Sequence, residues 1–411
     1  MNTDKATSST THEPEDDGTE WARRPTPTED AFDGDTERGA DTQELALFYL
    51  HLADAEFDGY CDLYAHLARS IASDPEMLAQ IAAMAPAAKI IPILLFAAIH
   101  DHLLAHPQEP LAAIYRGDPG DGWPPFRAFL LDHFDELRAV VHARTIQTNE
   151  VGRSAVLLPT LTAIHRVYRR PLAMIELGPS AGLNLYLDRF SYDYTSQDPP
   201  YASERTAGDL TSSVRLSCQR RGPLHPPLDA DPPPIASRMG IDINPIDVTD
   251  EDASRWLEAC LWPLVPDRAE RLRAALHLAR SDPPDLRNGT IMDHLPAMID
   301  AVPADVVPVI ISTWVLAYFS KDGRLEVSEL LHRLGERREL ACVTAEYPSV
   351  VPWISRPTRE AHDNSGQAAT VVGLAMWQAG VPAARPIAWT HAHGRWIDWL
   401  DDETADGPSL G

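Results

Sequence analysis

A carboxylate is followed closely by two glycines in the stretch Glu176-Leu-Gly178-Pro-Ser180-Ala-Gly182. The residues just before Glu176 are apolar, as in a buried strand, and the glycines let the chain turn sharply into a helix. An open α/β sheet builds its ligand crevice in this way, at the carboxyl end of a strand. We therefore expect a ligand-binding turn whose candidate contacts are Glu176, Gly178, Ser180, Gly182 and Asn184.

A second carboxylate, Asp242, ends an expected core strand at residues 237–243. A carboxylate can accept hydrogen bonds from both hydroxyls of a ribose, so the two acids and the glycines predict a nucleoside-binding site. The dinucleotide pattern G-x-G-x-x-G is not met, because Ser180 and Leu183 hold its second and third glycine positions. No lysine follows the glycines, which excludes a Walker A phosphate loop.

These motifs resemble those of class I S-adenosylmethionine-dependent methyltransferases, which bind their cofactor with an acidic-x-Gly turn and a Gly-x-Asp-x-x-Pro strand end. The second motif here is Gly240-Ile-Asp242-Ile-Asn-Pro245. Together with Gln147-Thr-Asn-Glu-Val-Gly-Arg153 and His393-Gly-x-Trp396, they are similar to motifs of a bacterial and archaeal family, domain of unknown function 2332. The resemblance covers roughly residues 45–400. It implies a methyltransferase-like Rossmann fold but no established reaction.

The resemblance also implies S-adenosylmethionine as the cofactor. Glu176 would anchor its methionine end, the two glycines would shape the pocket, and Asp242, beside Asn244, would hold the ribose. Thr290 stands where these methyltransferases often place an aspartate that touches adenine, so Asp293 is the substitute candidate. The expected activity is methylation of an unidentified small molecule. A non-catalytic protein that binds a nucleoside or cofactor is the alternative, since folds outlast functions.

A different chemistry fits the same turn, because Gly178-x-Ser180-x-Gly182 also matches the nucleophile elbow of serine hydrolases. A later aspartate and His393 would complete the triad. Three features weaken this reading: only helices precede the turn, no His-Gly-Gly oxyanion loop appears upstream, and Pro179 restricts the residue before the nucleophile. Ser180 is otherwise a small residue at a tight turn.

Further polar groups could line the crevice. Residues 147–153 are either an exposed turn and helix cap or a polar wall, whose substrate-binding candidates are Gln147, Asn149, Glu150 and Arg153. Trp314 and Tyr347 follow expected strands and could contact a flat acceptor, although core packing explains Trp314 better. A base is needed only if the acceptor must lose a proton, and the candidates are His393, Glu346 and Glu150. We expect no metal site, because His391-x-His393 and His100-Asp-His102 lack a convincing third ligand.

Hydrophobic periodicity indicates how these groups are positioned. We expect a disordered acidic tail at 1–42, a helical domain at 43–170, and a Rossmann-like domain at 171–411. Strands that alternate with helices after residue 170 predict an α/β fold with a doubly wound, mostly parallel sheet. A loop-rich insertion is expected at about 191–236, with one weak strand at 213–218. Residues 370–380 fit a helix or a strand, and a hairpin is expected at 386–399.

Composition limits the partners. The net charge is −26, with 61 acidic and 35 basic residues, of which three are lysines. This excess argues against nucleic acid or an anionic membrane as a partner and fits a halophilic, acidic proteome. Four scattered cysteines predict no disulfide framework, and the N-terminus has no apolar leader. We expect a cytoplasmic protein that acts on a small molecule; the oligomeric state does not follow from the sequence.

Overall fold

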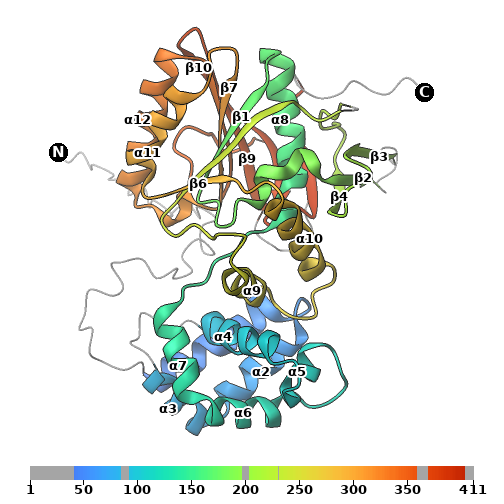
Figure 1. The fold of residues 1–411 in the computed structure, drawn as a ribbon, viewed down its shortest axis with the longest axis vertical. Coiled ribbons are helices and arrows are strands. Elements are labelled where there is room, and N and C mark those ends of the chain that lie inside the picture. Colours follow the sequence, from blue (N-terminus) through green and yellow to red (C-terminus); the bar gives the residue numbers. More distant parts are fainter. Residues whose placement is uncertain (1–40, 85–91, 197–202, 230, 359–368, 403–411) are drawn as a thin grey trace, which may run out of the picture.

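The computed structural model describes residues 41–84, 92–196, 203–229, 231–358 and 369–402. The expected acidic tail at 1–42 lies almost wholly outside these residues, and helix α1 begins at Thr42. Figure 1 shows two lobes along the long axis, one built around a sheet and one made of helices, with α9 (Glu251–Ala259) between them.

The helical lobe is made by the N-terminal part of the chain. Aromatic residues Phe57, Tyr64 and Phe96 pack edge-to-face or stacked at its centre. Trp256 of α9 joins this core, so the lobe takes one helix from beyond residue 170. Its other elements are α1 (Thr42–Leu52), a π-helical turn (Ala53–Phe57), α2 (Asp62–Ala72), α3 (Pro75–Met84), α4 (Pro92–Ala105), α5 (Pro110–Tyr115), α6 (Trp123–Asp132) and α7 (Phe134–Ala143).

Within the described residues, the sheet contains eleven strands in the order β3-β2-β4-β11-β10-β9-β8-β7-β1-β5-β6. The segment β6-β5-β1-β7-β8 is wholly parallel and reproduces the order 3-2-1-4-5 of a doubly wound fold. Its strands are β1 (Leu172–Leu177), β5 (Ile235–Asp242), β6 (Asp285–Asn288), β7 (Val307–Thr313) and β8 (Leu340–Glu346). The fold is therefore α/β and Rossmann-like, with a mostly parallel sheet preceded by helices, as predicted.

Helices cover both faces of this sheet (Figure 1). Leu172 and Met174 of β1 face the core shared with α8 (Ser154–Tyr168) and α10 (Arg268–Arg280). Ile175 and Leu177 face the core shared with α11 (Ile291–Ala301) and α12 (Lys321–Arg337). Burial on both faces explains why β1 has a continuous apolar run rather than an alternating one.

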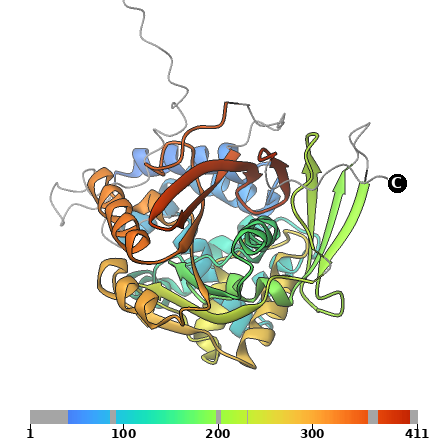
Figure 2. The same ribbon diagram turned by 90° about the horizontal axis from the view of Figure 1, so that it is seen from above.

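The expectation of a loop-rich insertion at 191–236 is wrong in its secondary structure. This segment contains β2 (Ser191–Ser196), β3 (Ser203–Gly208) and β4 (Arg215–Arg221), which extend the sheet beyond β11 and form a projecting edge in Figure 2. β4 overlaps the weak strand expected at 213–218, whereas the polar faces of β2 and β3 hid their strand pattern. The undecided stretch at 370–380 is strand β9 (Ala369–Gln378), and the C-terminal hairpin pairs β10 (Val381–His391) with β11 (Trp396–Trp399), as expected.

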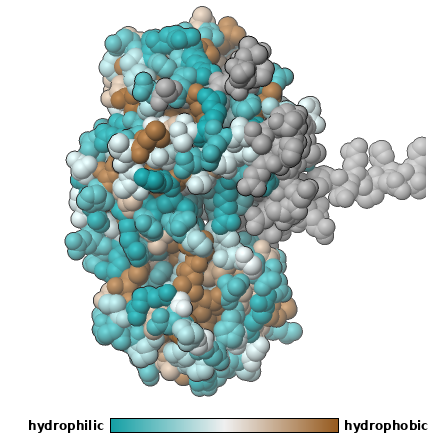
Figure 3. Space-filling view, turned by 90° about the vertical axis from the view of Figure 1, so that its right-hand side faces the viewer, coloured by the Kyte–Doolittle hydropathy of each residue, from teal (hydrophilic) through white to brown (hydrophobic). Residues whose placement is uncertain are grey.

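Among the described residues, every helix is too short or too polar to cross a bilayer. The face in Figure 3 is largely hydrophilic, and apolar residues gather mainly on its lower half, over the helical lobe.

Candidate functional site

The topological switch point lies between β1 and β7, where the strand order reverses direction. In open α/β sheets, ligands bind outside the carboxyl ends of the strands at this point. Glu176 lies near the end of β1, and Thr313 ends β7. Asp242 ends β5, the other neighbour of β1. The structure therefore brings the two predicted acidic motifs together beside the switch point.

Register places Glu176 and Asp242 on one face of the sheet. Glu176 pairs with Gly240, and the Gly178 amide donates to the Ile241 carbonyl at 2.8 Å. Because side chains alternate along a strand, Glu176 and Asp242 both point to the side of α8 and α10. Gly178 and Gly182 between them have φ values of 60° and 70°, as the sharp turn required.

The Glu176 carboxyl group is buried and only half satisfied. Its Oε1 accepts a 3.4 Å hydrogen bond from the Asn184 amide, whereas its Oε2 has no partner among the described residues. Burial raises the pKa of Glu176 to about 8, because desolvation disfavours the charged form. Asn184 is fixed in turn by the Ser154 hydroxyl, which donates to its Oδ1 at 2.9 Å. Glu176 is therefore held in place with one acceptor unused.

The Asp242 carboxylate organises the turn that it faces. Its Oδ2 accepts from the Ser180 amide and its Oδ1 from the Asn244 amide, each at 2.8 Å. Each carboxylate oxygen has two lone pairs, so an acceptor position remains on both. The next residue, Ile243, is 80% exposed and places an apolar side chain beside this carboxylate. The sequence alone does not indicate Ile243 as a site residue, because an isoleucine after a strand carries no polar signal.

Residues 147–153, which follow the helical lobe in the chain, form hydrogen bonds with the segments that follow β1 and β5. The Gln147 amide donates to the Asn244 carbonyl at 2.7 Å, and Asn149 Oδ1 accepts from the Leu183 amide at 2.9 Å. These two candidate substrate contacts thus support the turn and the loop after β5. A Cβ on Gly394 would lie 2.1 Å from the Gly152 carbonyl oxygen. The backbone of the C-terminal hairpin therefore packs directly against the backbone of this segment.

Both carboxylate oxygens of Glu150 accept hydrogen bonds from protein groups. Its Oε2 accepts from the Arg268 guanidinium at 2.7 Å, and its Oε1 accepts from the Gly152 amide at 3.1 Å. Burial alone would raise the pKa of Glu150, but the charges of Arg268 and Arg153 outweigh it and hold this pKa at about 2. Glu150 is therefore an ionised structural anchor. Arg268 was missed because its sequence position resembles an ordinary helix start, 118 residues away.

Arg153 lies among three carboxylates, those of Glu150, Glu346 and Glu176. Its Nε donates to the Ala392 carbonyl at 3.0 Å and its Nη1 to the Thr313 carbonyl at 3.3 Å. No described residue accepts from Nη2. The guanidinium also lies 5.8 Å from the centre of the Trp314 ring. Among the described residues, the Arg153 Nη2 group therefore remains an uncommitted donor beside the switch point.

Trp314 and Tyr347 meet at the ends of β7 and β8. Their rings make an edge contact at 4.3 Å, and Trp314 has a φ of 60°, an unfavourable value for a bulky residue. Glu346 holds this turn, because its Oε1 accepts from Ser312 Oγ and from the Val315 and Leu316 amides. Burial raises the pKa of Glu346, whose Oε2 is unpartnered within the described structure. By strand alternation Glu346 faces the α12 side, opposite to Glu176.

The remaining candidates have identifiable local roles. Burial lowers the pKa of His393 to about 3, so its imidazole is neutral at physiological pH, and its Nδ1 lies 3.4 Å from the Tyr60 hydroxyl. Asp293 accepts from the Thr290 hydroxyl at 2.7 Å in the first turn of α11. Ser180 Oγ is buried and has no hydrogen-bond partner among the described residues. Within the described part of the chain, no base therefore contacts the hydroxyl that a serine hydrolase would use.

Residues 48–399 match a family described as an uncharacterized protein conserved in bacteria, DUF2332. The chain belongs to this family. The match spans both lobes, so the DUF2332 region includes the helices, the glycine turn and the C-terminal hairpin. A comparison with curated proteins gives no match.

Proposed function

We propose that this DUF2332 protein is an S-adenosylmethionine-dependent methyltransferase that acts on a small molecule. One observation carries the proposal. Glu176 and Asp242 end neighbouring parallel strands, on the same face of the sheet and on either side of a positive-φ glycine turn, beside the switch point. This arrangement favours binding of a nucleoside whose charged tail runs across the turn.

The amino-acid end of the cofactor fits the unused groups near β1. It carries an ammonium group and a carboxylate, which require an acceptor and a cationic donor. Glu176 Oε2 is a buried acceptor without a partner in the described structure, and Arg153 offers Nη2. Charge-assisted bonds of this kind are stronger than neutral ones. Glu176 would therefore hold the ammonium group, and Arg153 the carboxylate.

The nucleoside end fits the groups near β5. Asp242 keeps an acceptor position on each oxygen for the two ribose hydroxyls, while its bonds to Ser180 and Asn244 fix its orientation. Ile243 gives an exposed apolar surface for one face of a purine. Asp293 lies past the end of β6 and remains the candidate for a polar adenine contact, although it already accepts a hydrogen bond from Thr290, the N-cap of α11.

The bound cofactor would supply an electrophilic methyl group, and the protein would align the acceptor with it. None of the three base candidates is well suited to remove a proton: Glu150 is paired, Glu346 faces the opposite side of the sheet, and His393 has a low pKa. We therefore propose an acceptor whose nucleophilic atom needs no deprotonation by these groups. Trp314 and Tyr347 would contact it.

Calorimetric titration with S-adenosylmethionine and S-adenosylhomocysteine in high salt tests the proposal. We expect micromolar binding by the native chain and at least a roughly tenfold loss in Asp242→Asn, which keeps one acceptor for the turn. Asp300→Asn is the matched control and should bind normally, because Asp300 is an exposed acid of α11 that pairs with Arg337 of α12. No binding by the native chain would refute the proposal. Binding without methyl transfer to any pooled small molecule would support the non-catalytic alternative.

A serine-directed fluorophosphonate probe tests the remaining alternative. We expect no labelling of Ser180, because its Oγ has no base against it in the described structure. Labelling that disappears in Ser180→Ala would instead favour a hydrolase.

A further inference from the structure

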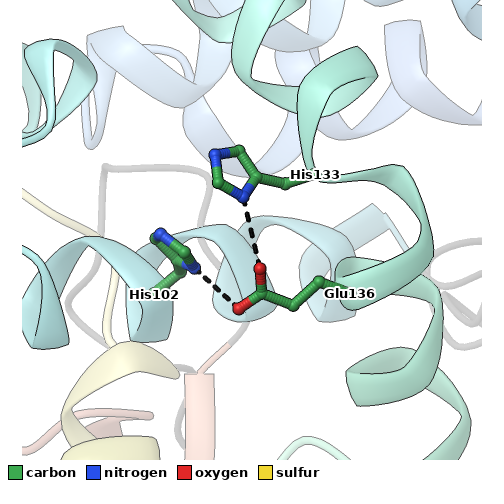
Figure 4. Close-up of side chains that lie close together, drawn as sticks. All are labelled: His102, His133 and Glu136. Carbon is green, nitrogen blue, oxygen red and sulfur yellow. Dashed lines mark hydrogen bonds and ion pairs between the residues drawn. The ribbon is translucent and has the colours of Figure 1, made fainter.

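Three potential metal ligands converge in the helical lobe, far in sequence from the proposed cofactor site. His102 projects from α4, His133 lies between α6 and α7, and Glu136 is in the first turn of α7. Figure 4 shows both imidazoles directed at the one carboxylate. His102 Nδ1 lies 3.0 Å from Glu136 Oε1, and His133 Nδ1 lies 3.2 Å from Glu136 Oε2. The sequence hides this cluster, because His102 and Glu136 lie 34 residues apart, whereas the histidine pairs visible in the sequence are close neighbours in the chain.

We propose that His102, His133 and Glu136 bind a divalent transition-metal ion, with Zn²⁺ as the best fit. One ligand atom from each residue can be chosen so that all lie within 4.8 Å of one another. Tetrahedral zinc with bonds of 2.0–2.1 Å has ligands about 3.3 Å apart. The two nitrogen-to-oxygen distances run to different oxygens of the Glu136 carboxylate, and each is close to that value. Because one atom from each residue already lies within 4.8 Å of the others, side-chain rotations would bring the three atoms around one ion.

The donor set selects the class of ion. Two imidazole nitrogens and one carboxylate oxygen suit zinc and its borderline neighbours, whereas calcium and magnesium prefer oxygen ligands alone. The Glu136 side chain is 55% exposed, so an ion can enter from solvent, and a water molecule can take the fourth position. The large negative charge of the chain also favours a cation.

Neighbouring rings hold the two imidazoles in place. Phe129 packs edge-on to His102 at 5.0 Å and stacks on His133 at 4.3 Å, and His106 stacks on His102 at 4.2 Å. His100 is turned away, because its Nδ1 lies 3.2 Å from the Ala259 carbonyl. A bound ion would pin α4 to the start of α7 and stabilise the lobe in proportion to its affinity.

Titration of the untagged full-length chain with ZnCl₂, together with visible spectroscopy of the Co²⁺ form, tests the site. We expect one ion per chain, a tetrahedral cobalt spectrum and a higher melting temperature with Zn²⁺. His102→Ala and Glu136→Gln should each weaken binding more than the roughly 10–100-fold caused by loss of an outer partner. His66→Ala is the matched control, since His66 and Asp121 form a 2.9 Å pair for which the described structure shows no third ligand.

The control is expected to bind like the native chain. Absence of saturable binding, or binding that neither variant weakens, would overturn the proposal, as would an equal loss in His66→Ala. Glu136→Gln has nearly the shape of the native residue, so its melting curve without metal distinguishes loss of a ligand from loss of the fold.

Discussion

Two buried glutamates near the same strand ends are treated in opposite ways by the fold. Glu150, from the 147–153 segment, is 4% exposed, and both of its oxygens accept hydrogen bonds from protein groups. Glu176, from β1, is 2% exposed, and one of its oxygens has no partner in the described structure. The pKa of the first is held at about 2, whereas that of the second is raised to about 8.

This difference distinguishes residues that stabilise the fold around the site, here called the support, from residues that are free to bind a ligand, here called the site. Most polar groups of the 147–153 segment form hydrogen bonds with Arg268, with the loop after β5 and with the glycine turn. The strand ends keep unused acceptors at a cost in stability, and such a cost is common at functional sites. We therefore expect changes in the segment to affect mainly the free energy of unfolding, and changes at the strand ends to affect mainly binding.

The largest effect is expected for Glu150→Gln, which leaves the charge of Arg268 buried without its counter-ion. The free energy of unfolding should fall by about 3–5 kcal/mol, measured by urea denaturation at pH 7. Because the pKa of Glu150 is lowered on folding, its contribution is present above about pH 4.5 and is lost as the pH falls toward 2. The double variant Glu150→Gln/Arg268→Met should recover part of the loss. If the free energy of unfolding falls by less than about 1 kcal/mol, Glu150 does not stabilise the fold as proposed and the distinction between support and site is wrong.

Gly394→Ala tests how the C-terminal hairpin supports the 147–153 segment. Gly394 has a φ of 70°, and its added Cβ would lie 2.1 Å from the Gly152 carbonyl oxygen. We expect a loss of about 3 kcal/mol in thermal or urea unfolding. Gly59→Ala is the matched control: its φ is 69°, but no described atom lies within 4 Å of the added Cβ, so about 1 kcal/mol is expected. Equal losses would show that the backbone contact contributes nothing.

Glu176→Gln should show how much the buried, partly unpaired carboxyl group of Glu176 lowers the free energy of unfolding. A carboxyl group whose pKa rises on folding destabilises the fold progressively as the pH increases from about 4.5 through 8. The native chain should therefore lose on the order of a few kcal/mol relative to Glu176→Gln between pH 5 and pH 8. Parallel denaturation curves of the two proteins at both pH values measure this difference. No change in the difference with pH would mean that Glu176 is already ionised.

The smallest effect is expected for Gln147→Ala, which removes one hydrogen bond to the loop that follows Asp242. The free energy of unfolding should fall by about 1 kcal/mol. Gln43→Ala, on the exposed side of α1, is the control and should change stability by much less. If Gln147→Ala leaves stability unchanged but abolishes cofactor binding, Gln147 belongs to the site rather than to its support.

The sequence predicted those strands and turns that are marked by residues close together in the chain. The apolar run before Glu176 and the glycines after it located β1 and its turn, and the acid before Asn244 located the end of β5. It did not predict β2 and β3, because their alternating polar residues resemble loops. Nor could it predict the Glu150–Arg268 pair or the His102–His133–Glu136 cluster, since each depends on packing between distant segments: Glu150 and Arg268 are 118 residues apart, and His102 and Glu136 are 34 residues apart.

The central claim is that Glu176 is protonated in the free protein and binds the cofactor's ammonium group as a carboxylate. Calorimetric titration with S-adenosylhomocysteine at pH 7, in buffers of different ionisation enthalpy, counts the protons exchanged on binding. We predict net proton release by the native chain and none by Glu176→Gln, which should also bind more weakly. Binding of equal strength by both proteins, with no proton release, would contradict the account.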